Sequence, residues 1–235
     1  MKGTLIDLLT DPRLADLRKL DLRHNDLTDA EFAACGLLAR SPRLRRLSLE
    51  GNRITSETVG RIVTTPNAGQ LVELDLSDND LRGDWCNLLS DSPMTSLWRL
   101  NLARCRLTAG DIERLAASPI LRTVRTLNLE GNPIGNTGVR ALARSPHLQR
   151  LQELKIQRCA IGREGIRELS QAPFARHLSS YDVLSNDFET EWLLQVGSEL
   201  FGWDERELGS IESRIDMDRM FREMRSTSAN KVQIP

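Results

Sequence analysis

The chain has 235 residues, 28% of them charged, and a formal net charge of −1 at pH 7. Such a balance provides no bulk attraction to nucleic acid or to an acidic membrane surface, and no apolar run approaches the roughly 20 residues that span a bilayer. The N-terminus is interrupted by Asp7, Asp11 and Pro12 and is therefore a poor signal peptide. We expect a cytoplasmic protein with neither a nucleic-acid nor a membrane partner.

Residues 1–16 predict a short helical half-unit, "LIDLLTDPRL", in which Leu5, Leu8 and Leu9 cover the edge of the first strand. If this cover is incomplete, the exposed edge of the first strand could pair with a second copy and give an end-to-end homodimer. Alternatively, the chain is one piece of a longer protein.

A repeating pattern occupies residues 17–188. It begins at Leu17, Leu44, Leu71, Leu97, Val124, Leu151 and, degenerately, Leu178, with spacings of 26 or 27 residues. Seven copies at a regular period indicate a repeat architecture. We expect one strand per copy, near 19–22, 46–49, 73–76, 99–102, 126–129, 153–156 and 180–183.

The copy "LRRLSLEGNRI", Leu44 to Ile54, shows how one unit works. Leu47 and Leu49 alternate with polar residues and should face one side of a strand. Asn52 ends the strand, where its side-chain amide can bond backbone groups that the turn leaves unpaired. Cysteine takes this place in two copies, as Cys105 and Cys159, because a small thiol suits a buried position.

The second half of each unit predicts a helix. Thr28 with Glu31 and Thr108 with Asp111 form capping-box patterns. A proline stands near the end of every unit and should stop the helix, at Pro12, Pro42, Pro66, Pro93, Pro119, Pro146 and Pro173. Stacking the units in parallel would bury both sets of apolar residues in one continuous core.

The pattern LxxLxLxx(N/C)x(L/I), from about Leu5 to Phe188, resembles the leucine-rich repeat, and its period resembles the ribonuclease-inhibitor-like subclass. The resemblance implies an α/β solenoid: a right-handed βα superhelix with a parallel sheet on the concave face and helices on the convex face. It implies seven strand-bearing repeats and a C-terminal helical cap.

The four cysteines predict buried free thiols. Cys105 and Cys159 lie at equivalent positions two repeats apart, roughly 10 Å, which is too far for a disulfide. Cys35 and Cys86 lie in different helical halves, and no CxxC or Cys/His spacing suggests a metal or a cofactor. Arginine outnumbers lysine 28 to 4, which suggests a GC-rich, bacterial genome.

Residues 189–225 leave the period and show helical spacing, which favours a cap on the last repeat. An alternative is that Met217, Met220, Phe221 and Met224 form an adaptable helix for a partner. Residues 226–235 have no pattern and are expected to be a flexible tail.

Polar residues that alternate with the strand leucines should form columns on the concave side. The first column is Lys19, Arg46, Glu73, Arg99, Thr126, Glu153 and Ser180, and the second is Asp21, Ser48, Asp75, Asn101, Asn128, Lys155 and Asp182. A third, after the strands, is Arg23, Glu50, Ser77, Ala103, Glu130, Gln157 and Leu184. Mixed signs suit selective pairing with a protein, or they pair with one another on a solvated sheet.

We therefore predict a protein-binding site at Arg46, Glu73, Asp75, Trp98, Arg99, Asn101, Asn128, Glu153 and Lys155. Trp98 stands where most other repeats carry polar residues. It is either a binding anchor or leans on a neighbouring unit or on Trp85.

No catalytic residues are predicted, because His24, His147 and His177 occupy different places in the repeat and no phosphate-binding glycine loop is present. The leading hypothesis is a non-catalytic recognition scaffold or adaptor. The subclass also resembles the Ran GTPase-activating protein, so a regulator of a nucleotide-hydrolysing partner is the alternative. A purely structural, self-assembling role is a third.

Overall fold

The computed structural model describes residue 11, residues 15–83, 85–90 and 92–202, and residues 206 and 209. Contacts divide the chain into two compact units, Met1–Asn186 and Asp187–Pro235. The expected N-terminal half-unit lies mostly outside the described residues. The methionine-rich segment and the tail lie outside them entirely.

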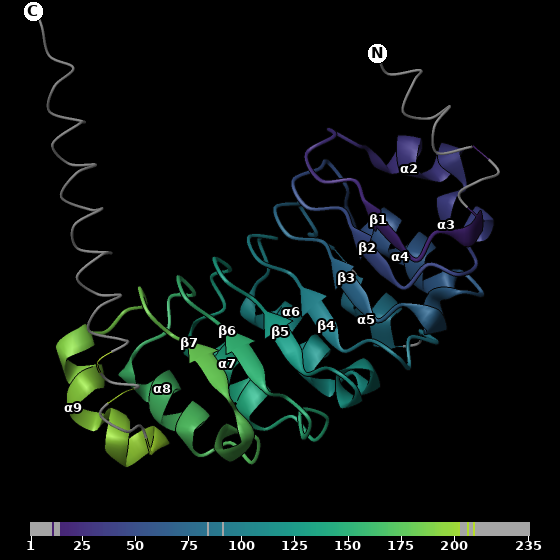
Figure 1. Cartoon of the computed structure of the whole chain (residues 1–235). Helices are drawn as coiled ribbons and strands as arrows, with labels where there is room; N and C mark the ends of the chain where they lie inside the picture. Colours follow the sequence, from purple (N-terminus) through teal and green to yellow (C-terminus); the bar gives the residue numbers. More distant parts are fainter. Residues whose placement is uncertain are drawn as a thin grey trace, which may run out of the picture. The chain divides into compact units, whose positions relative to one another are not determined.

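Seven short strands form one parallel sheet in sequence order (Figure 1). They are β1 (Lys19–Asp21), β2 (Arg46–Ser48), β3 (Glu73–Asp75), β4 (Arg99–Asn101), β5 (Thr126–Asn128), β6 (Glu153–Lys155) and β7 (Ser180–Asp182). Each begins at the expected residue and is one residue shorter than expected. The hydrogen bonds between strands continue one residue past these bounds, as from Leu49 N to Asp75 O at 2.8 Å. The expected and the observed strands therefore differ only in the assignment of the last residue.

The strand leucines stack as predicted. Leu47, Leu74, Leu100 and Leu127 are directly opposite one another in successive strands, and none is more than 2% exposed. Burying a side chain of this size contributes about 1.5–3 kcal/mol to folding. One row of aliphatic side chains therefore runs through the sheet from repeat to repeat.

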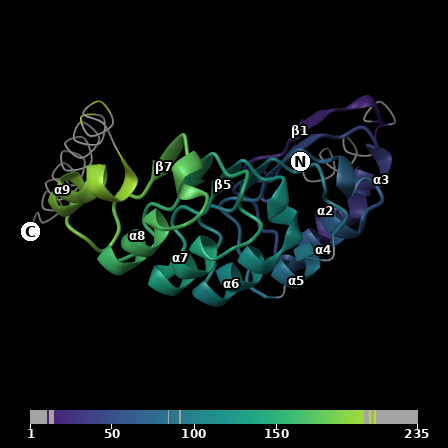
Figure 2. The ribbon, with the colours of Figure 1, turned by 90° about the horizontal axis from the view of Figure 1, so that it is seen from below.

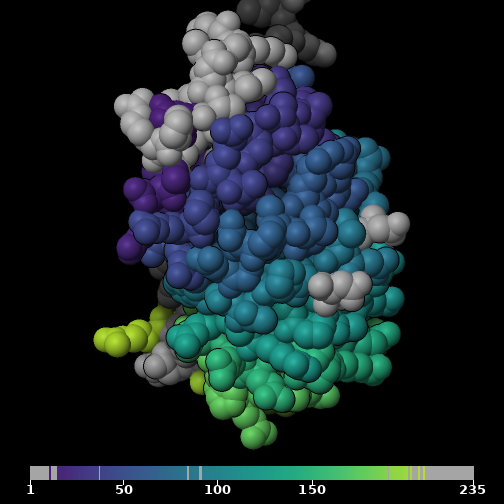
Figure 3. All heavy atoms as spheres, turned by 90° about the vertical axis from the view of Figure 1, so that its right-hand side faces the viewer, coloured from purple at the N-terminus to yellow at the C-terminus, as the bar shows by residue number. Residues whose placement is uncertain are grey.

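Helices cover one side of the sheet and leave the other side open (Figure 2). They are α2 (Asp29–Cys35), α3 (Leu37–Arg40), α4 (Ser56–Thr64), α5 (Trp85–Ser90), α6 (Ala109–Ala117), α7 (Gly135–Ala143) and α8 (Arg163–Ser170). Short 3-10 helices follow three of them, at Ala68–Gln70, Pro119–Arg122 and Ala175–His177. In Figure 3 the repeats appear as successive coloured bands across one face.

The predicted helix signals are confirmed. Thr28 with Glu31 and Thr108 with Asp111 form capping boxes at the starts of α2 and α6. Each of the helices α4, α6, α7 and α8 ends before the proline of its unit. The sequence thus sets the starts of α2 and α6 and the ends of α4, α6, α7 and α8.

The asparagine after a strand bonds backbone groups of the turn, as predicted for Asn52, and it also bridges two repeats. Asn132 is wholly buried. Its Nδ2 donates to the carbonyls of Leu102 and Leu129 at 2.8 Å, and its Oδ1 accepts from the amides of Cys105 and Leu107 at 3.0 Å. Asn52, Asn79 and Asn186 bond in the same manner. These amides satisfy turn groups that would otherwise be buried without partners.

Cysteine performs half of this task where it replaces asparagine. The thiol of Cys105 donates to the carbonyl of Leu76 at 3.2 Å, and that of Cys159 to the carbonyl of Leu129 at 3.2 Å. All four cysteines are free and buried. Burial raises the pKa of Cys86 and Cys105 to about 12.

The second unit contains α9 (Thr190–Phe201), which ends at Gly202 in the left-handed conformation. Phe188 and Trp192 meet edge to face at 5.7 Å between ring centroids. In neither unit do the described residues include a helix long and apolar enough to cross a membrane.

Replacing Asn132 by alanine should lower the free energy of unfolding by about 2–4 kcal/mol, because two buried amides and two carbonyls lose their partners together. Urea unfolding followed by circular dichroism measures this. Asn25 is the control: it is exposed and donates one bond, to the carbonyl of Arg23. Asn25→Ala should cost less than about 1 kcal/mol, and equal losses in the two variants would contradict the assigned role.

The cysteines should resist alkylation in the folded protein. At pH 8 a thiol with a pKa of about 12 is ionised roughly a thousandfold less than one near 9, and only the thiolate reacts. Iodoacetamide followed by mass spectrometry should therefore modify none of the four in the native chain and all four in urea. Rapid labelling of Cys105 in the native state would show that the turns open.

Candidate protein-binding face

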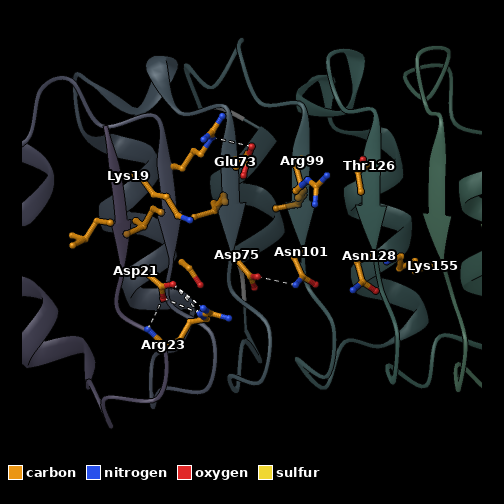
Figure 4. Close-up of a pocket in the computed structure, with 16 residues that line it drawn as sticks. Lys19, Asp21, Arg23, Glu73, Asp75, Arg99, Asn101, Thr126, Asn128 and Lys155 are labelled. Carbon is orange, nitrogen blue, oxygen red and sulfur yellow. Dashed lines mark hydrogen bonds and ion pairs between the residues drawn. The ribbon is translucent and has the colours of Figure 1, made fainter. Parts of the chain in front are cut away.

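The strand register places the first column side by side on the open side of the sheet. Arg46 lies opposite Lys19 and Glu73, and Glu73 opposite Arg99. The open side, which we call the strand face, carries a hollow of about 310 Å³ bordered by residues of β1 to β6 (Figure 4). Side chains from six repeats therefore border one depression.

Most of the predicted site residues border this hollow, namely Arg46, Glu73, Asp75, Arg99, Asn101, Asn128 and Lys155. Two do not: Glu153 lies on β6, and Trp98 precedes β4. Residues that the predicted set omitted also line it, namely Lys19, Asp21, Arg23, Ser48 and Thr126. The sequence could have indicated these five residues, since each belongs to one of the three columns of polar residues.

The first column carries charges of both signs, and some of them are paired. Arg46 Nε contacts Glu73 Oε1 at 3.0 Å, and the Arg99 guanidinium carbon lies 5.2 Å from the centre of the Trp98 ring. Trp98 is half-buried, and Arg99 is exposed. Trp85 is completely buried within α5. The half-buried ring of Trp98 is therefore in a cation–π contact with Arg99.

The second column has a structural duty that sequence reasoning missed. Asp75 Oδ1 accepts from the amide of Ser77 at 3.0 Å, and Asn128 Oδ1 accepts from the amide of Glu130 at 3.0 Å. Asn101 Oδ1 does the same with the amide of Ala103 at 3.2 Å. Such bonds, two residues ahead, begin the turn that leaves the strand.

Bonds between repeats fix this column further. Asn101 Nδ2 donates to Asp75 Oδ2 at 2.9 Å and to Ser77 Oγ at 3.2 Å. Lys155 departs from the pattern and pairs with Glu153 at 3.2 Å. The second column is therefore largely committed to the protein's own backbone, whereas the first column offers the more available charges.

The turns after the strands carry a chain of ion pairs. The residue before each asparagine or cysteine takes a positive φ, and Arg104 does so at 53°. Its guanidinium contacts Asp78 at 2.6 Å and Glu130 at 3.4 Å, and Arg158 contacts Glu130 at 3.3 Å. Hydrogen bonding to Arg104 lowers the pKa of Asp78 from its usual value.

The described part of the chain contains no group of three or more His, Cys, Asp or Glu side chains that could hold a metal ion. The thiols are buried within the repeats, and burial raises the pKa of Cys159 to about 11. What this face offers chemically is hydrogen bonding and charge.

Comparisons with known proteins point to a repeat family. A family model described as Leucine Rich repeat matches residues 14–30 and 121–143. A ribonuclease inhibitor of Sus scrofa is 35% identical over 133 residues, which make up 53% of this chain and 29% of that protein. NACHT, LRR and PYD domains-containing protein 2 of Homo sapiens is 36% identical over 128 residues, 52% of this chain and 12% of that protein. The chain thus spans less than a third of the length of these relatives.

Solved structures with some likeness to the chain include an internalin from Listeria monocytogenes, with a TM-score of 0.48 and 21% identity, covering 73% of this chain and 49% of that one. Another is leiomodin-1 actin-binding site 2, with a TM-score of 0.45 and 17% identity, covering 73% and 95%.

Replacing Arg104 by alanine should raise the pKa of Asp78 towards the ordinary value of about 3.9, because the hydrogen bond that favours the carboxylate is lost. NMR titration of the Asp78 carboxyl carbon measures this change. Since the pair is partly exposed, stability should change by less than about 1 kcal/mol. Arg82→Ala, which removes the partner of Asp80, should leave Asp78 unaltered. A shift of Asp78 in that control would point to a general effect of charge.

Proposed function

We propose that the chain, which is similar to leucine-rich repeat proteins, is a non-catalytic recognition scaffold, or adaptor, that binds a protein partner through the strand face. The observation that carries this proposal is the first column. Its residues Lys19, Arg46, Glu73 and Arg99 stand on neighbouring strands and border one hollow. Charges of both signs at fixed spacing select a partner by complementary charge.

The size of the face supports a protein as the ligand. Seven strands about 4.8 Å apart make a stripe of roughly 30 Å, comparable to the width of a standard protein interface. Glu73 and Asp75 stand among the cations of the hollow, and a continuous phosphate backbone would be repelled at these positions. The face therefore suits a surface that carries both signs.

Within the predicted set, the energetic centre that we propose is Trp98 with Arg99. Tryptophan and arginine are enriched among the residues that dominate binding energy, and here the cation lies against the ring. Arg46, Glu73, Glu153 and Lys155 would provide selectivity around it. Asp75, Asn101 and Asn128 would contribute mainly by holding the strand ends in place.

We also propose that residues 17–188 form the recognition unit and that 189–225 cap its last repeat, with an uncovered first strand allowing end-to-end pairing of two copies. Four buried free thiols fit a reducing, cytoplasmic compartment.

The test exchanges an ion pair on each side of the sheet. Arg46→Glu with Glu73→Arg swaps a pair on the strand face, and Glu57→Arg with Arg61→Glu swaps a pair on α4. Both double variants keep the pair and the net charge. A partner captured by the unaltered chain and identified by mass spectrometry should bind the strand-face variant at least about tenfold more weakly, which corresponds to about 1.4 kcal/mol. It should bind the helix-face variant equally well.

Equal binding by both variants would place the partner elsewhere on the molecule. If the captured partner hydrolyses a nucleotide, its turnover with and without the chain separates the two roles: a rate increase indicates a regulator, and unchanged turnover indicates a scaffold.

A further inference from the structure

A group of arginines gathers where the chain passes from helix to strand in three consecutive repeats. It consists of the exposed residues Arg122, Arg125, Arg144, Arg150 and Arg176, with His147 and His177 in the same segments. We call it the basic edge. None of its arginines forms an ion pair with a carboxylate among the residues that the structure describes.

The local sequence explains why these cations are uncompensated. The segments 117–125, 143–152 and 170–179 contain no aspartate and no glutamate. The net charge of −1 hides this, because the balancing carboxylates lie elsewhere in the repeats. The repeat period carries the segments to the same edge of the sheet, so their positive charges add together.

The other edge, where strands pass into helices, differs sharply. Six arginines there each contact a carboxylate at 2.5–3.3 Å, namely Arg23, Arg53, Arg82, Arg104, Arg106 and Arg158. On the basic edge, by contrast, a row of arginines has no carboxylate partner among the described residues.

The basic edge also has a shape. A hollow of about 450 Å³ lies between two neighbouring turns and is lined by Arg122, Thr123, Pro146, His147, Gln149 and Arg150. Arg122 Nε donates to His147 Nδ1 at 3.3 Å, which orients the guanidinium and leaves its terminal nitrogens available. Arginines from two repeats therefore flank one depression, each able to bind a carboxylate with two hydrogen bonds.

We propose that the basic edge binds an acidic segment of a polypeptide, with Arg122 and Arg150 as its principal contacts. Equivalent positions two repeats apart, such as Arg122 and Arg176, are separated by roughly 10 Å, a distance that about three residues of extended chain cover. An acidic run would therefore meet cations from successive repeats.

A nucleic acid fits this edge less well. Single strands use exposed aromatic rings as stacking platforms. Apart from the two histidines, the aromatic ring within these three segments belongs to Phe174, which is 1% exposed.

The basic edge is separate from the strand face, and an acidic segment is a different ligand from a partner surface that carries both signs. The test uses the full chain and fluorescein-labelled octa-glutamate, with binding followed by fluorescence anisotropy at low ionic strength. Octa-glutamate should bind, and more weakly as salt is added, whereas octa-lysine should not. Arg122→Gln with Arg150→Gln should weaken binding at least about tenfold.

The matched control is Arg53→Gln with Arg82→Gln, which removes the same charge from the opposite edge and should change the affinity less than about twofold. Arg176→Gln provides a second, milder variant with an intermediate loss. Equal weakening by both double variants, or no binding of octa-glutamate at all, would overturn the proposal. Tighter binding of an oligothymidylate of about 15 nucleotides would overturn it in favour of nucleic acid. Capture through the strand face is a separate measurement, so failure here leaves that proposal standing.

Discussion

The structure depends on one recurring type of side chain, the asparagine that follows a strand, namely Asn52, Asn79, Asn132 or Asn186. Its amide donates to carbonyls of its own strand and the previous one, and its oxygen accepts amides from the previous turn, as Asn132 does with Cys105 and Leu107. These bonds help to fix the register, because each has a specific partner. Cys105 and Cys159 offer a thiol in place of the amide and reach only the carbonyl side.

This fixed register gives the two faces of the sheet their separate roles. Leucines that point inward stack into a buried row. The polar residues between them stack in the same register on the strand face, where they are exposed to solvent and to a partner. Opposite charges on adjacent strands attract, as Arg46 and Glu73 do, whereas Lys19 lies opposite the like charge of Arg46. The second column ties the strand ends to the turns, so the first column is displayed on a backbone that is already rigid. A rigid array loses little conformational freedom on binding.

The fold could be predicted from the sequence because its signals repeat. Seven leucine patterns, two capping boxes and a proline in every unit agree with one another, and Asn52 behaves as its position suggests. The candidate face was predictable only as columns of residues. That Asn101 would bond Asp75, or that Asp75 would bond the amide of Ser77, depends on side-chain angles that no periodicity specifies. The basic edge was missed because a net charge averages over the whole chain.

The direction of the asparagine bridges bears on how the protein is made. Each bridge runs backwards along the chain: Asn52 bonds the turn of the first repeat, and Asn132 that of the fourth. During synthesis, a turn that leaves the ribosome keeps open amides until the next unit emerges about 27 residues later. The last turn of a nascent chain therefore cannot complete its asparagine bridge until the following repeat has been synthesised.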